Sequence, residues 1–284
     1  MNQHLHLGRG MTRGALTILP IWSTTSARPR YTFDATKLHV AEADNPVVSQ
    51  LMIGNVGDRP ALVMEGLLFE GGLQHRMATR SMMVGVHQRI PLPVACVEQG
   101  RWGGASQQST RGRRATPYIR ESVRRPAGHD VQGEVWSRVA ERTHGHHNPT
   151  SSFVRRLDVA DARRVDWSDV KPLEGQCGVL LAIGGQPCVA EVFESSMVLH
   201  GQWRSILEAA ALDAQVAPAV LTPGRRARRF LERIEALELR DNGSAGIGDE
   251  AVALDDKVSV TALRWHDRDV HTRMTNLRHP MLVA

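Results

Sequence analysis

Residues 65–102 decide the fold, and they read EGLLFEGGLQHRMATRSMMVGVHQRIPLPVACVEQGRW. Two polar clusters lie in this stretch, GGLQHR at 71–76 and CVEQGRW at 96–102, and each follows an apolar run typical of a β-strand. Polar side chains at strand ends are poor core material and often belong to binding or catalytic sites. We therefore expect the rest of the chain to be scaffold around these two clusters.

The apolar runs around the clusters predict a mostly antiparallel sheet. Residues 47–53 and 61–69 read as two strands joined by the turn signal GNVGD, so they are expected to pair as a hairpin. Residues 15–22, 81–86 and 91–97 are further strands, the last with prolines that favour an edge position.

The C-terminal half predicts a hairpin over 178–193, whose Gly184-Gly185 pair suits a two-residue primed turn. A regular register places Leu181 opposite Cys188 and Cys177 opposite Val192. The two cysteines are then too far apart along the ladder for a disulfide, so buried thiols are expected. Residues 258–265 and 269–273 are a second hairpin, next to a glycine-rich turn at 241–248.

Apolar residues at three- and four-residue spacing predict helices over 133–142, 199–216 and 226–239. Together the patterns predict an α+β fold, with antiparallel sheet mostly in the N-terminal part and a few helices packed on it. We expect a single domain over 15–284 after an N-terminal tail, 1–14. The interval 103–132 lacks apolar periodicity and is expected to be a long, exposed, arginine-rich loop.

The chain has 284 residues and a formal charge of +5, with 35 lysines and arginines. Only Lys37, Lys171 and Lys257 are lysines, which leaves 32 arginines. An odd count of three cysteines favours a cytoplasmic setting. No apolar run approaches the length of a membrane span, so no membrane partner is expected.

Familiar catalytic motifs are missing: the sequence has no nucleophile elbow, zinc-protease helix, paired CxxC or phosphate-binding P-loop. His144, His146 and His147 have no cysteine or carboxylate beside them, so no metal site is predicted. The cofactor, if any, is unspecified.

The first cluster combines backbone freedom with donors for an anion. Gly71 and Gly72 allow the chain to come close to a ligand. Gln74, His75 and Arg76 offer an amide, an imidazole and a planar guanidinium, a set that suits phosphate or carboxylate recognition. These five residues are the first candidate ligand-binding residues.

The second cluster adds Arg101 and Trp102 to the candidate ligand-binding residues. Strand alternation places Cys96 and Glu98 on one face, which makes them the candidate catalytic pair. The alternative is a buried cysteine beside a Glu–Arg ion pair and a packing tryptophan. If the clusters form one site, the arginines of both should share a concave surface with Gln74 or Glu98 between them.

The stretches GGLQHR, LPVACVEQGRW, QGEVW (132–136), GQPCVAEVF (185–193) and AAALDA (209–214) together resemble the ARG and rhodanese-phosphatase-superfamily-associated protein domain, where ARG denotes ADP-ribosylglycohydrolase. The resemblance spans roughly residues 16–214. The family usually has a lysine-like residue at Leu73 and Asn or Asp at His75. The positions that match are Gln74, Arg76, Cys96, Glu98, Arg101 and Trp102. The resemblance implies a role near NAD- or ADP-ribose-derived metabolites and fixes no reaction.

Three hypotheses follow. The first is a site that binds or processes an ADP-ribose-like or other phosphate-bearing small molecule at the two clusters. The second is a non-catalytic protein partner of a nucleotide-processing enzyme. The third is nucleic-acid binding through Arg111–Arg125; with Tyr118 as the only aromatic residue in that stretch, base stacking has little support.

Overall fold

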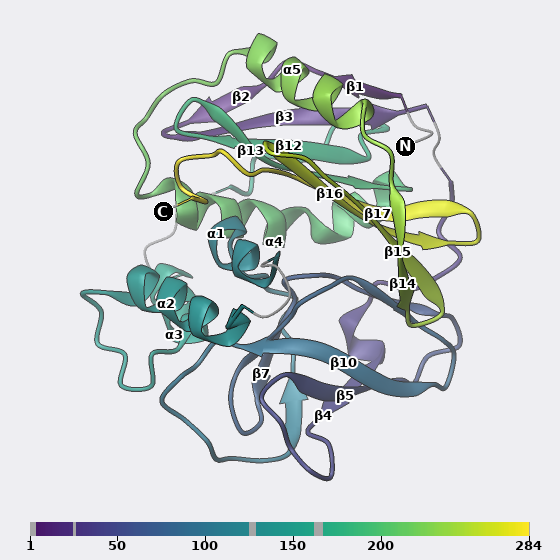
Figure 1. The fold of residues 1–284 in the computed structure, drawn as a ribbon, viewed down its shortest axis with the longest axis vertical. Helices are drawn as coiled ribbons and strands as arrows, with labels where there is room; N and C mark the ends of the chain where they lie inside the picture. The colour runs from purple at the N-terminus through teal and green to yellow at the C-terminus, as the bar shows by residue number, and fades with distance from the viewer. Residues whose placement is uncertain (1–3, 25–26, 125–128, 162–166, 284) are drawn as a thin grey trace. The chain divides into compact units, whose positions relative to one another are not determined.

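The computed structural model describes residues 4–24, 27–124, 129–161 and 167–283. Its contacts group into two compact units, one of Met1–Arg30 with Trp167–Ala284 and one of Tyr31–Asp166. Both units combine helices with antiparallel sheet, so the α+β prediction is confirmed (Figure 1). Among the described residues, no helix is long and apolar enough to cross a membrane.

Unit 1, the first of these, is a single sheet with a helix on each face. Its elements are β1 (Leu5–Leu7), β2 (Met11–Arg13), β3 (Leu16–Ser23), β12 (Gly178–Ile183), β13 (Gln186–Phe193), α4 (Ser196–Ala214), α5 (Gly224–Glu235), β14 (Arg240–Ala245), β15 (Gly248–Leu254), β16 (Val258–Trp265) and β17 (Arg268–Asn276). The strand order is β1-β3-β12-β13-β17-β16-β15-β14, with β2 paired to β3. The predicted tail thus contains two short strands, and the predicted turn at 241–248 is itself a strand hairpin.

The helices of unit 1 follow from their apolar spacing. In α5, four buried side chains recur at three- and four-residue intervals and pack on Leu180 and Val192 of the sheet; they are Ala227, Phe230, Leu231 and Ile234. Figure 1 shows α4 on the opposite face of the same sheet. The Oγ of Ser195 caps α4 by accepting from the backbone N–H of Met197, and Pro218 follows the helix.

The hairpin of β12 and β13 exists, but its predicted register is wrong. Gly184 and Gly185 both have positive φ, as a primed turn requires. A bulge between Leu181 and Ala182 then shifts the ladder by one residue, so Leu181 lies opposite Val189. The conclusion about thiols still holds, because all three cysteines are free and buried.

The described residues of unit 2 form a closed barrel, three α-helices, two short 3₁₀ helices (η) and a separate strand pair. Its elements are η1 (Ala35–Lys37), β4 (Leu38–Ala41), β5 (Gln50–Asn55), β6 (Ala61–Val63), β7 (Leu68–Gly71), β8 (Arg76–Ala78), β9 (Met82–Val84), β10 (Arg89–Cys96), β11 (Gln107–Ser109), α1 (Pro117–Arg120), η2 (Glu121–Arg124), α2 (Val131–Thr143) and α3 (Phe153–Asp161). The barrel order is β10-β5-β4-β11-β7-β8. β6 pairs with β9.

The predicted hairpin over 47–69 is therefore wrong. β5 pairs with β4 and β10, and the predicted strand 61–69 is two strands, β6 and β7, that enter different sheets. The break falls at Gly66, whose φ is 82° and where a β-carbon would lie 2.6 Å from the Arg120 side chain. Local periodicity could not show that the chain changes sheets at this glycine.

Alternation along the barrel strands places one set of side chains inside. Cross-strand pairs put Leu92 beside Leu51 and Ile53 beside Val40, and all four are buried. The same face of the sheet carries Arg76, which is opposite Cys96. The barrel interior is therefore apolar along most of its length and polar at the end where β8 begins and β10 ends.

Candidate functional site

The two polar clusters meet because β8 pairs antiparallel with β10, which sets Arg76 directly opposite Cys96. A path of hydrogen bonds then joins them. Arg76 Nη1 donates to Gln74 Oε1 at 3.0 Å, and Gln74 Nε2 donates to the Glu98 carbonyl at 2.9 Å. Gln74 and Glu98 thus connect the two guanidinium groups through hydrogen bonds. That Arg76 and Arg101 share a concave surface stays a prediction.

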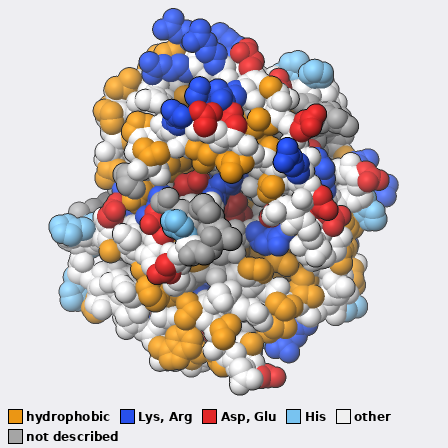
Figure 2. Space-filling model, in the orientation of Figure 1, with side chains coloured by type: hydrophobic (Ala, Val, Ile, Leu, Met, Phe, Trp, Pro, Cys, Tyr) orange, Lys and Arg blue, Asp and Glu red, His pale blue; other side chains and the backbone are white. Residues whose placement is uncertain are grey.

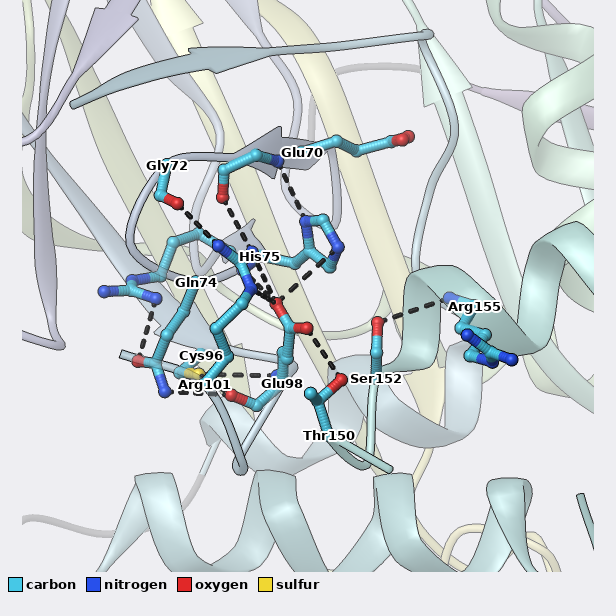
Figure 3. A network of polar contacts seen from close by, with 12 residues as sticks. Glu70, Gly72, Gln74, His75, Cys96, Glu98, Arg101, Thr150, Ser152 and Arg155 are labelled. Carbon is cyan, nitrogen blue, oxygen red and sulfur yellow. Dashed lines mark hydrogen bonds and ion pairs between the residues drawn. The ribbon is translucent and has the colours of Figure 1, made fainter. Parts of the chain in front are cut away.

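Glu98 is the centre of the second cluster (Figure 3). Its carboxylate is almost fully buried, and Oε2 accepts from Arg101 Nη2 at 2.6 Å and from the backbone N–H of His75 at 3.1 Å. Oε1 accepts from the Thr150 hydroxyl at 2.8 Å. Burial alone would raise the pKa of Glu98, but these donors outweigh it and hold the pKa below its ordinary value.

Every N–H group of the Arg101 guanidinium donates a hydrogen bond within the protein. Nε and Nη2 donate to Glu98, and Nη2 also donates to the carbonyl of Gly71 at 3.0 Å. Nη1 donates to the carbonyls of Gly72 and Gly103 at 2.6 and 2.8 Å. A guanidinium has five N–H donors, and these contacts occupy all of them. Arg101 therefore clamps the loop between β7 and β8 to the loop that follows β10.

Backbone conformation and lack of space explain why glycine occupies positions 71 and 72. Gly71 and Gly72 have φ of 96° and 57°, in the region that favours glycine. A β-carbon on Gly72 would lie 1.8 Å from Gln108 Nε2. Only glycine lets the loop pass close to β11, so Gly71 and Gly72 shape the site through their backbone.

Arg76 differs from Arg101. Its side chain has no exposed surface, and apart from Gln74 its guanidinium approaches Glu42 Oε1, 3.8 Å from Nη2. Among the described residues, Arg76 Nε and Nη2 have no hydrogen-bond partner. A buried charged donor without a partner costs free energy, so such atoms call for an explanation.

Two side chains with an unused hydrogen-bond acceptor, Glu42 and Gln108, lie at the same end of the barrel. Gln108 Nε2 donates to Glu42 Oε1 at 3.2 Å and to the Gln74 carbonyl at 3.0 Å. The other oxygens, Glu42 Oε2 and Gln108 Oε1, are buried and accept no hydrogen bond within the described residues. This end of the barrel thus combines an incompletely bonded cation with two incompletely bonded acceptors.

Trp102 lies over this end. Its ring centroid is 5.6 Å from the Arg76 guanidinium carbon, a cation–π distance. The side chain is nonetheless half exposed, at 54%, and it follows Arg101 in a loop without regular structure. Trp102 therefore borders both solvent and the buried arginine.

His75 is held as a neutral ring. Its Nδ1 accepts from the backbone N–H of Gly71 at 2.9 Å, and its Nε2 lies 3.6 Å from Glu98 Oε2. Burial lowers the pKa of His75, with a further contribution from Arg101, against the opposing charge of Glu98. The imidazole therefore accepts a hydrogen bond from the backbone of its own loop.

Cys96 is a buried thiol. Its Sγ donates to the Glu98 carbonyl at 3.1 Å, while the Gln132 side chain bonds both its backbone N–H and its carbonyl at 2.8 Å. Burial raises the pKa of Cys96, although Arg76 lies near enough to oppose the shift. The environment favours the protonated thiol over the thiolate that a nucleophile needs.

The arginine-rich interval 103–132 is not a long exposed loop, which corrects the prediction. It contains β11, α1 and η2, and Ala115, Tyr118 and Ile119 are buried. Arg113 pairs with Glu70 and Asp158, and Arg114 Nη2 donates to the Glu65 carbonyl at 2.9 Å. These cations are used within the unit; Arg125 lies outside the described residues.

Several site residues carry no signal in the sequence. Glu42, Gln108 and Thr150 reach the clusters only through closure of the barrel and the bridge between Glu98 and Ser152. One missed element was readable, because Thr116-Pro117 is an N-cap followed by proline at the first helical position. Among the described residues, no three potential metal-ligating side chains gather.

Comparison with known proteins gives one match. A family model described as the ARG and Rhodanese-Phosphatase-superfamily-associated Protein domain matches residues 4–275. No curated protein and no solved structure matches the chain.

Proposed function

Since the chain belongs to the ARG and rhodanese-phosphatase-superfamily-associated protein domain family, we propose that unit 2 binds a small anionic metabolite at the Arg76 end of its barrel. The class we propose is a phosphate-bearing sugar or nucleotide of the ADP-ribose or NAD-derived kind. The observation that carries the proposal is the Arg76 guanidinium, which is fully buried with two nitrogens lacking hydrogen-bond partners among the described residues.

The neighbouring acceptors narrow the ligand further. An anionic group on the ligand would accept from Arg76 Nε and Nη2, in the paired geometry that guanidinium groups favour. Hydroxyl groups would donate to Glu42 Oε2 and Gln108 Oε1, which are the acceptors at this end of the barrel. A sugar phosphate carries both an anionic phosphate and several hydroxyl groups.

Trp102 is the proposed lid. Its half-exposed ring covers Arg76 and follows directly on Arg101, whose contacts fix the start of the loop. Rotation of the ring away from the guanidinium would open the end of the barrel to a ligand. The ring would then offer a face on which an adenine or nicotinamide base stacks.

Arg101 is a positioning residue in this proposal. Its five N–H groups already bond to Glu98 and to backbone carbonyls. A ligand contact by Arg101 would require one of these bonds to break. Arg76 has nitrogens to offer and Arg101 does not, so Arg76 takes the anion and Arg101 holds the walls of the site.

Binding is favoured over catalysis. Glu98 is a carboxylate with donors on both oxygens, and Cys96 is a buried thiol whose pKa is raised by burial. If the site performs chemistry, Glu98 is the candidate base and Cys96 is not the nucleophile. A non-catalytic role beside an enzyme is the second candidate, and the family description, which names association with enzymes of two classes, favours it.

Calorimetric titration with ADP-ribose, NAD, AMP and ribose 5-phosphate tests the proposal. We expect at least one of them to bind the parent protein, and Arg76→Lys to weaken that binding by about 2 kcal/mol because lysine cannot make the paired contact. Ligand binding should change the tryptophan fluorescence of the parent protein. Trp102→Phe should still bind the ligand but without this fluorescence change. Cys96→Ala should bind as the parent does.

Arg101→Lys is the matched control. It makes the same chemical change in the neighbouring cluster. We expect it to lower the free energy of unfolding and to leave the order of affinities for the four compounds unchanged. Equal binding by the parent and Arg76→Lys would overturn the assignment of Arg76. If no compound on the panel binds the folded parent, the accessory role becomes the better account.

A further inference from the structure

A second surface, on unit 1, combines exposed aliphatic side chains with exposed arginines. The segment between α4 and α5 carries Val216, Val220 and Leu221, which are 67%, 47% and 63% exposed. The first turns of α5 carry Arg225, Arg228 and Arg229, all exposed. These six residues are called the basic–apolar surface below.

The aliphatic side chains are held outward by the fold. The backbone N–H of Thr222 donates to Thr17 Oγ1 at 3.2 Å, and Arg226 Nη1 donates to the Gly185 carbonyl at 2.8 Å. These two bonds, both on the C-terminal side of Leu221, tie the segment to β3 and to the β12–β13 turn. Its exposure is therefore set by the structure, and an ordered apolar patch on a surface indicates an interaction site.

The arginines are not explained by the stability of α5. None of Arg225, Arg228 and Arg229 has an ion pair within the described part of the chain, whereas Arg233 in the last turn pairs with Asp255. The positive end of a helix dipole is its N-terminus, so Arg225 in the first turn is unfavourable there, and Arg228 and Arg229 in the second turn gain nothing from the dipole. The first turn of α5 also contains no acidic residue.

The two features are neighbours in sequence and in space. Figure 2 shows Lys and Arg side chains gathered over the α5 end of unit 1, with hydrophobic side chains beside them where Figure 1 draws the segment that enters α5. Cations around protruding aliphatic groups make a surface that is complementary to a layer with anionic headgroups and an apolar interior.

We propose that the basic–apolar surface docks unit 1 onto the surface of an anionic phospholipid bilayer. Val216, Val220 and Leu221 enter the boundary between headgroups and acyl chains, and the arginines bond lipid phosphates and carboxylates. The contact is peripheral, and it requires no spanning segment.

Other polyanions fit less well. A nucleic-acid backbone would use the arginines but leave the aliphatic groups in water, and the surface has no aromatic side chain for base stacking. Energetic centres of protein interfaces favour tryptophan and tyrosine over valine and leucine. A bilayer uses both halves of the surface.

Cosedimentation of the full chain with phosphatidylcholine vesicles, with and without about 30 mol % phosphatidylserine, tests the proposal. We expect binding only with phosphatidylserine, and loss of binding as salt rises. The triple variant Arg225→Gln, Arg228→Gln, Arg229→Gln should bind roughly 100-fold more weakly, since each arginine near an anionic bilayer contributes about fivefold.

Arg89→Gln, Arg240→Gln, Arg268→Gln is the matched control, because it removes three exposed arginines from other places. It should cost at most a few-fold. An equal loss in both triple variants would overturn the proposal by showing general charge attraction. Tighter binding to duplex DNA than to the vesicles, lost in the α5 triple variant, would also overturn it in favour of nucleic acid.

Insertion has its own readout. The natural cysteines are all buried, so a cysteine introduced by Leu221→Cys can be labelled selectively with an environment-sensitive dye. Its emission should shift to the blue on phosphatidylserine vesicles, while the same label at the exposed strand residue Leu254, through Leu254→Cys, should not shift. An unshifted label at 221 on sedimented protein would exclude insertion and overturn the proposal.

Discussion

The two arginine-rich stretches of this chain, 111–124 in unit 2 and 225–229 in unit 1, read alike in sequence and have opposite surroundings. In the first, Arg114 is buried against the Glu65 carbonyl, and Arg113 reaches Glu70 and Asp158. In the second, Arg225, Arg228 and Arg229 face solvent without an ion pair among the described residues.

What separates them is the supply of acceptors from other elements. The 111–124 stretch lies against β7 and α3, which bring Glu70 and Asp158, and against the turn that carries Glu65. The apolar side of α5 packs on the sheet, and the described residues of unit 1 bring no ion-pair partner to Arg225, Arg228 or Arg229 on its exposed side. Arginine composition alone therefore does not identify a polyanion site. The surroundings of the arginines decide whether they are already paired within the protein.

The largest predicted effect is in the buried stretch. Arg114→Ala removes a fully buried cation and leaves the Glu65 carbonyl without its donor, so the free energy of unfolding should fall by about 3–5 kcal/mol. Arg228→Ala is the control and should change it by less than about 0.5 kcal/mol. Denaturant titration of the two variants compares them directly, and similar values would remove the distinction between the stretches.

Glu98 should give the next largest effect. Glu98→Gln keeps the shape of the side chain but withdraws the negative charge from Arg101, and one of its terminal atoms becomes a donor facing other donors. Loss of charged hydrogen bonds of this kind costs about 2–3 kcal/mol.

A double-mutant cycle with Arg101→Met measures the coupling between the two side chains. A coupling energy near zero would mean that the clamp is not an energetic unit, and Arg101 would then be available to a ligand.

Cys96 comes third. Cys96→Ala deletes one buried atom and a weak hydrogen bond to the Glu98 carbonyl, so we expect about 1 kcal/mol of destabilisation. The native protein should react with iodoacetamide at Cys96 only as fast as it unfolds, because the thiol is buried and its pKa is raised. Fast alkylation that a bound ligand blocks would restore Cys96 as a nucleophile.

Local sequence patterns predicted those features of the fold that depend only on residues close together in the chain. The α+β class, the helices near 133, 199 and 226 and the two C-terminal hairpins follow from apolar spacing and glycine turns, and the structure contains them. The bulge at Leu181 and the change of sheet at Gly66 depend on partners far along the chain. No local pattern contains that information.

The same division holds for the site. Gln74, Arg76, Glu98 and Arg101 could be selected as polar residues after strands, and the structure brings them into one network. Their roles could not be separated in sequence, because Arg101 and Arg76 look equivalent there. The acceptors Glu42 and Gln108 distinguish them, and they arrive only when the barrel closes.

The smallest predicted effect is the dependence of the stability of unit 2 on pH. Burial lowers the pKa of His75 in the folded state, so the contribution of this neutral ring is full above about pH 6.5 and is lost as the pH falls through the folded value. The lowered pKa of Glu98 adds a second loss below about pH 4.3, because the unfolded carboxyl takes up its proton first. Stability should therefore fall in two stages on acidification.

His75→Asn retains an acceptor for the Gly71 N–H and does not titrate, so it should flatten the upper stage and leave the lower one. His279→Gln is its counterpart in unit 1, where burial also lowers the pKa. Denaturation midpoints at about pH 7, 5.5, 4 and 3 measure both stages. An upper stage unchanged in both variants would assign it to other groups.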